Sequence, residues 1–152
     1  MKETFVCKVL KFALYIVFTV GFVGAVSLPF LADFYVQTFF SRTNISAEYQ
    51  SFVIPFLVSV APFCLWIVLE MIWLMRTIPK GPFVMRNVRA LHRIGVVFLI
   101  LSAAFLSKCF FFFTYLTLFC AILFVGAGLF AFTLAALIGQ SIAFKEENDL
   151  TI

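Results

Sequence analysis

The feature that most constrains this chain is the length of its apolar stretches. From Ile94 to Ala143 only one charged residue, Lys108, interrupts the sequence. A helix needs about 20 mainly apolar residues to cross the hydrocarbon core of a bilayer, so this stretch is long enough for two crossings. Apolar residues make up 64% of the chain and charged residues 12%, which is too few charges to cover a soluble domain. We therefore expect an integral membrane protein.

We predict a single domain over residues 1–152, an all-α membrane protein with four transmembrane helices. The predicted spans are 12–32, 52–75, 94–113 and 117–141. A turn at Lys108 would leave a third span of only about 14 residues, so we place the turn at residues 114–116. Lys108 is then near the outer end of the third span, and we expect its amine to extend outward to the membrane surface.

The distribution of lysine and arginine predicts the orientation. Four spans place both termini on one side, and of the 11 Lys and Arg residues only Arg42 and Lys108 fall on the other side. Cytoplasmic loops carry an excess of these residues, so we predict cytoplasmic N- and C-termini and a multi-pass protein of the plasma (inner) membrane. The net charge of +4 follows from this bias, and we expect no direct binding of nucleic acid.

The chain is poor in the residues that build catalytic and metal sites. It has one histidine, and its four cysteines form no Cys-x-x-Cys motif. It also lacks a glycine-rich phosphate loop and a Ser-His-Asp set. We predict no metal, no cofactor and no catalytic residue, and hence a protein that is not an enzyme.

One acidic residue, Glu70, lies inside a predicted span, about two turns from Arg76. A carboxylate within the membrane is costly and suggests a function by default. Candidate partners at a similar depth are Gln140, Lys11 and Arg93. Glu70 either makes a structural polar contact, for which Gln140 is a candidate, or extends to the cytoplasmic interface, or it couples the movement of a proton or another ion.

The fourth predicted span carries a stripe of small residues, which let helices approach closely in a membrane. They recur every four positions, at Ala127, Ala131, Ala135 and Gly139. The stripe packs either within a four-helix bundle or across a homodimer.

The segment between the second and third predicted spans is basic. It contains Lys80 and then, from Val84 onward, a predicted short amphipathic helix with Arg86, Arg89 and Arg93 on one face. Such a helix in the cytoplasmic loop contacts either the anionic lipid head groups of the bilayer or a cytoplasmic partner.

The C-terminal segment is acidic, with Glu146, Glu147 and Asp149. Its composition predicts a solvated end that leaves the last span on the cytoplasmic side. We group these residues with the basic ones as candidates for binding a partner.

Two of these cytoplasmic segments contain distinctive motifs. GPFVMRNVRALHRIG at 81–95 is similar to a pattern of Gly-x-Pro-Phe, Asn-Val, Leu and Ile-Gly, and EENDLTI at 146–152 is similar to an acidic ending with Asp-Leu-Thr-Ile. On these motifs the chain resembles a bacterial family of four-helix membrane proteins, domain-of-unknown-function family twenty-nine seventy-five. The chain departs from the family in having Gly81 and Pro82 contiguous, and Val84 in place of a capping Thr or Ser. Members are often encoded beside a Cro/C1-type helix-turn-helix regulator, so the resemblance implies a bacterial inner-membrane protein with a cytoplasmic regulator as partner.

Three functions are compatible with this sequence. The first is a membrane-bound partner or regulator of a cytoplasmic helix-turn-helix transcription factor, bound through residues 76–93 and the C-terminal segment. The second is a small ion-coupled transporter that works through Glu70. The third is a bacteriocin-immunity or envelope-stress protein that acts on the outer face, where Phe39 and Phe40 would contribute.

Overall fold

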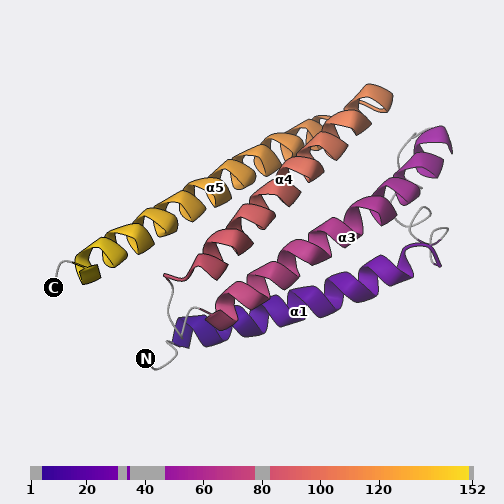
Figure 1. The fold of residues 1–152 in the computed structure, drawn as a ribbon. Helices are drawn as coiled ribbons and strands as arrows, with labels where there is room; N and C mark the ends of the chain where they lie inside the picture. The colour runs from indigo at the N-terminus through magenta and orange to yellow at the C-terminus, as the bar shows by residue number, and fades with distance from the viewer. Residues whose placement is uncertain (1–4, 31–33, 35–46, 78–82, 151–152) are drawn as a thin grey trace.

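The computed structural model describes residues 5–30, 34, 47–77 and 83–150, and these residues form four long α-helices (Figure 1). The helices are α1 (Phe5–Ser27), α3 (Ala47–Thr77), α4 (Met85–Phe111) and α5 (Tyr115–Leu150). Each contains a stretch that is long and apolar enough to cross a membrane. The predicted all-α fold with four helices of membrane-spanning length is therefore confirmed.

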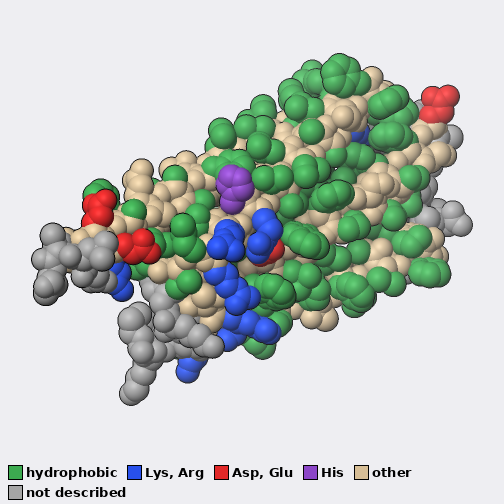
Figure 2. Space-filling view, in the orientation of Figure 1, with side chains coloured by type: hydrophobic (Ala, Val, Ile, Leu, Met, Phe, Trp, Pro, Cys, Tyr) green, Lys and Arg blue, Asp and Glu red, His purple; other side chains and the backbone are tan. Residues whose placement is uncertain are grey.

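Large apolar side chains cover much of the outside of these helices. Phe12 on α1, Phe63 on α3 and Phe130 on α5 are all exposed, and Figure 2 shows apolar side chains along most of the visible face. Exposing this much apolar surface to water would be strongly unfavourable, whereas hydrocarbon chains solvate it. Four candidate spans with an apolar exterior indicate a multi-pass integral membrane protein.

The helices form an open row rather than a closed bundle. Within the described ranges α1 contacts α3, α3 contacts α4, and α4 contacts α5, while α1 and α5 lie on opposite sides of the row (Figure 1). The predicted four-helix arrangement is present, and within the described residues the helices contact one another in chain order, without a contact between α1 and α5. Lipid tails are as apolar as the side chains, so no hydrophobic force closes such a row in a membrane.

The closest helix packing lies between α4 and α5. A Cβ added to Gly128 would lie 3.1 Å from the backbone oxygen of Gly95, so the two backbones approach closely at this point. Ala131 and Ala135 of the small-residue stripe are buried, and Ala127 and Gly139 are half-buried. Because α5 contacts only α4 in the part of the chain that is described, Ala131 and Ala135 pack against α4, whereas a Cβ added to Gly139 would meet nothing within 4 Å.

The basic segment after residue 82 is not a separate helix. Val84 is extended, with φ −132° and ψ 137°, and α4 then runs without a break from Met85 to Phe111. The helix predicted from Val84 onward is present from Met85, but it is the first part of α4 and not a short helix of its own in the loop. No proline occurs between these residues, so the basic turns continue directly into the apolar part of the same helix.

The turn between the last two helices lies at residues 112–114, next to the predicted position. Lys108 is inside α4, but its side chain does not extend outward as expected. The residue is only 7% exposed, and its Nζ donates a hydrogen bond to Thr117 Oγ1 at 3.0 Å. It also lies 5.6 Å from the centre of the Phe56 ring on α3. Residues of α3 and α5 therefore contact the amine of this α4 lysine, with a hydroxyl acceptor on α5 and an aromatic ring on α3.

Candidate functional site

Four arginine side chains gather where α3 ends and α4 begins. Here Arg76 lies in the last turn of α3, and Arg86, Arg89 and Arg93 lie in the first three turns of α4. Figure 2 shows lysine and arginine side chains together at this place, and Figure 1 shows that α1 begins and α5 ends at the same end of the molecule. We call this end, defined by the four arginines, the arginine end.

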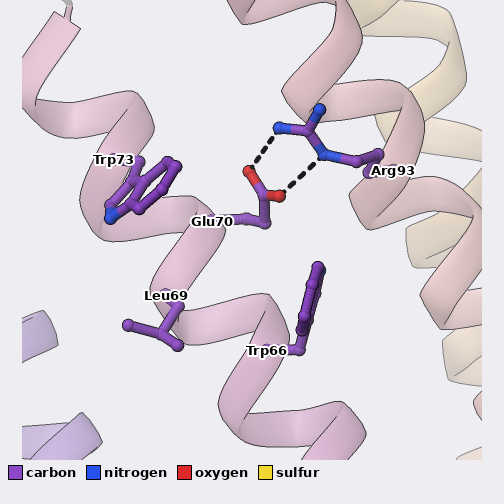
Figure 3. A pocket seen from close by; sticks show the side chains of 5 residues that line it. All are labelled: Trp66, Leu69, Glu70, Trp73 and Arg93. Carbon is purple, nitrogen blue, oxygen red and sulfur yellow. Dashed lines mark hydrogen bonds and ion pairs between the residues drawn. The ribbon is translucent and has the colours of Figure 1, made fainter.

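Glu70 on α3 and Arg93 on α4 form a bidentate ion pair (Figure 3). Arg93 Nε donates to Glu70 Oε1 at 2.7 Å, and Arg93 Nη2 donates to Glu70 Oε2 at 2.9 Å. The carboxylate side chain is 8% exposed, whereas the guanidinium side chain is 48% exposed. Two parallel bonds fix both the distance and the angle between the groups, so this contact constrains the approach of α3 to α4 at this point.

The sequence places Arg93 among three candidate partners of Glu70, and the structure brings these two together. Gln140 is exposed on α5, and α5 makes no contact with α3 within the described ranges. Gln140 is therefore not part of this site. The open row of helices is the reason, because it leaves α4 between α3 and α5.

Two aromatic residues hold further arginines at this end. The guanidinium carbon of Arg86 lies 5.7 Å from the centre of the Trp73 ring, a cation–π geometry. On the other side of α3, Arg76 donates to the Tyr15 hydroxyl of α1, from Nε at 3.0 Å and also from Nη2. The sequence analysis missed both contacts. Tyr15 and Arg76 are 61 positions apart, and no sequence pattern relates them.

Two hollows flank Trp73 on the surface between α3 and α4. One, of about 410 Å³, is lined by Trp66, Leu69, Glu70, Trp73 and Arg93. Figure 3 shows Glu70 between the two tryptophans along α3, with its carboxylate turned toward Arg93. The other, of about 340 Å³, is lined by Trp73, Arg76, Thr77 and Arg86. Trp73 borders both hollows.

Among the described residues, the other charged residues predicted for the site make no hydrogen bond or ion pair with Glu70 or Arg93. Arg89 is exposed and makes no hydrogen bond, ion pair or cation–π contact with the described part of the chain. Glu146 and Glu147 are exposed near the end of α5. Lys80, the side chain of Asp149, and the outer-face residues Phe39 and Phe40 lie outside the described residues.

The arginine end offers positive charge and hydrogen-bond donors that can bind an anion. Arg76, Arg86 and Arg93 carry three positive charges around Trp73, and Glu70 balances one of them. The described residues contain no group of three or more His, Cys, Asp or Glu that could hold a metal ion. Among these same residues every buried side-chain nitrogen and oxygen has a hydrogen-bond partner. Planar guanidinium groups with aromatic neighbours are suited to binding an anion such as a carboxylate or phosphate.

Comparison with known proteins gives no relative for this arrangement. The family resemblance of residues 81–95 and 146–152 therefore stays a prediction. No family model, no curated protein and no solved structure matches the chain.

Proposed function

We propose that this chain is a multi-pass protein of the bacterial plasma (inner) membrane that binds a cytoplasmic protein at its arginine end and catalyses no reaction. The observation that carries the proposal is the convergence of four arginines from α3 and α4, of which Arg89 is exposed and has no partner in the described part of the chain. The bias of lysine and arginine toward this end supports a cytoplasmic location for it and for both termini.

The division of roles among the arginines supports a docking surface. Arg93 is held by Glu70, and Arg86 lies against Trp73. Arg89 lies between them in the sequence, on the same face of α4, and adds an uncompensated charge. A rigid positive patch of this kind attracts an acidic partner and speeds its association.

The class of partner comes from the family resemblance, which implies a Cro/C1-type helix-turn-helix regulator encoded nearby. A membrane protein that binds such a regulator holds it away from DNA. The docking surface then acts by sequestration, and no catalytic residue is needed.

The test is a binding measurement on the full chain in lipid nanodiscs, with the purified helix-turn-helix protein encoded beside its gene as the analyte. Arg86→Glu/Arg89→Glu should weaken binding at least about tenfold, because two contacts change from attraction to repulsion. The matched control is Lys145→Glu, which reverses an exposed charge near the end of α5. The proposal is wrong if no such regulator is encoded there, or if the double variant binds it as tightly as the original chain.

A second candidate is ion-coupled transport, which the burial of Glu70 inside α3 favours. The bidentate bond to Arg93 weighs against it, because an exchanging proton or ion would have to displace the guanidinium. Proton flux into reconstituted vesicles that contain a pH-sensitive dye separates the two candidates. Transport predicts that Glu70→Gln abolishes the flux, whereas unchanged flux removes this candidate.

A further inference from the structure

We infer that the two hollows around Trp73 together hold one anionic phospholipid, with its phosphate beside Arg86 and one acyl chain along Trp66 and Leu69. The inference requires the four helices to span a membrane. It does not depend on the docking of a cytoplasmic protein. The ligand is a phosphodiester that carries one net negative charge and is attached to hydrocarbon.

The hollow next to the end of α3 supplies the polar half of this site. It is lined by Arg76, Thr77 and Arg86 together with Trp73. Arg86 makes a cation–π contact with Trp73 but no hydrogen bond or ion pair with the described residues, so its N–H donors are available to a phosphate. Arg76 also lines the hollow while its guanidinium holds Tyr15, which keeps a second positive charge in place there.

The hollow deeper along α3 supplies the apolar half. Trp66, Leu69 and Trp73 line it, and each of these side chains is substantially exposed. Trp66 and Trp73 are seven residues apart, or about 10 Å along a helix at 1.5 Å per residue. The two hollows therefore form a path from the charged end of α3 toward the middle of the predicted span, and its lining changes from basic to aromatic and aliphatic. A phospholipid changes from phosphate to hydrocarbon over the same direction.

The charges select an anionic lipid over a zwitterionic one. Glu70 cancels the charge of Arg93 and holds that side chain against α3. Arg76 and Arg86 remain, and among the described residues Glu70 is the only carboxylate that lines either hollow. A head group with its own ammonium would bring a positive charge among these arginines, whereas a phosphatidylglycerol head group brings none.

The experiment uses the only two tryptophans of the chain, Trp66 and Trp73, which both line the site. Lipids with brominated acyl chains quench tryptophan fluorescence on contact. The full chain is placed in phosphatidylcholine nanodiscs, and brominated phosphatidylglycerol or brominated phosphatidylcholine is added in increasing mole fraction. We expect half-maximal quenching at about fivefold lower mole fraction for phosphatidylglycerol, the factor that one arginine contact with an anionic lipid provides.

Two variants on the same face of α4 distinguish a specific lipid-binding site from a general attraction of anionic lipids to the positive charges of the protein. Arg86→Gln should bring the phosphatidylglycerol curve to the phosphatidylcholine curve, whereas Arg89→Gln, which removes the same charge from a residue outside both hollows, should leave the fivefold difference intact. Far-UV circular dichroism verifies the fold. Arg86 loses no hydrogen bond to the described residues in this change, so a folded variant is expected.

Several results would overturn the inference. Equal quenching by the two lipids would show contact without selectivity, and equal losses in the two variants would show attraction by surface charge alone. Excess inorganic phosphate should leave the quenching unchanged, and relief of quenching would mean that the site takes free phosphate instead of a lipid. None of these measurements includes a regulator protein, so their failure is distinct from failure of the proposed docking function.

Discussion

Removing Arg93 should destabilise the protein much more than removing Glu70, although each change breaks the same ion pair. In Arg93→Met the carboxylate of Glu70, whose side chain is 8% exposed in the original chain, loses both of its guanidinium donors. An uncompensated buried charge of this kind costs about 3 kcal/mol. In Glu70→Gln the remaining guanidinium is 48% exposed and can bind water or lipid head groups, so we expect a cost of about 1 kcal/mol.

The double variant completes a thermodynamic cycle. In Glu70→Gln/Arg93→Met neither charge remains, and both replacements keep the approximate volume of the original side chains. Relative to Arg93→Met alone, the second change should therefore restore about 2 kcal/mol, since no charge is left buried without a partner.

The assay is unfolding of the full chain in dodecylmaltoside micelles by titration with sodium dodecyl sulfate, followed by far-UV circular dichroism. Tryptophan fluorescence is unsuitable here because Trp66 and Trp73 line the same hollow as the ion pair. Arg89→Met is the matched control, since Arg89 has no partner among the described residues, and its stability should change by less than about 0.5 kcal/mol. Equal costs for the two single variants, or additive costs in the double variant, would refute the reasoning.

Two further predictions concern the packing of α4 against α5, with the same unfolding titration as the measurement. Gly128→Ala should lower stability by about 1–2 kcal/mol, because its new methyl group would lie 3.1 Å from the Gly95 oxygen. Gly126→Ala, which meets nothing within 4 Å, should be neutral or slightly stabilising, and equal losses in both would contradict the packing. Ser102→Ala should cost about 0.6 kcal/mol, because the buried hydroxyl donates to a carbonyl of α5 at 3.0 Å. The hydroxyl of the exposed Ser107 donates a hydrogen bond within its own helix, so Ser107→Ala should leave the stability almost unchanged. A similar loss of stability in both serine variants would refute the prediction.

The sequence predicts the four helices because the signal is local. The apolar stretches are long, and the charges that interrupt them are few, so each span can be recognised without knowledge of the others. The turn at residues 112–114 follows from the same arithmetic, since only a turn beyond Lys108 leaves two complete spans. The sequence could also have predicted that the basic segment is continuous with α4, because no residue after Met85 stops the helix.

The contacts between helices could not be predicted from the sequence, because they depend on which helices are neighbours. Glu70 had three candidate partners, and only the antiparallel contact of α3 with α4 selects Arg93. Lys108 looked like an outward-pointing lysine because the contacts of its amine with α3 and α5 cannot be inferred from α4 alone. The open row of helices could not be predicted either. In lipid, an apolar helix face can pack against a neighbouring helix or against acyl chains, so its sequence does not identify its partner.

The ion pair between α3 and α4 has a consequence for the axial alignment of the helices. Two apolar helices in hydrocarbon can slide along each other at little cost, because each new position buries similar surface. A slip of one helical turn, about 5.4 Å, would separate Glu70 from Arg93 and strand a carboxylate in the bilayer. The ion pair therefore fixes the axial alignment of α3 with α4. The alignment of α1 with α3 depends instead on the hydrogen bond between Tyr15 and Arg76 near the membrane surface. Under mechanical tension across the membrane, α1 should shift against α3 before α3 shifts against α4.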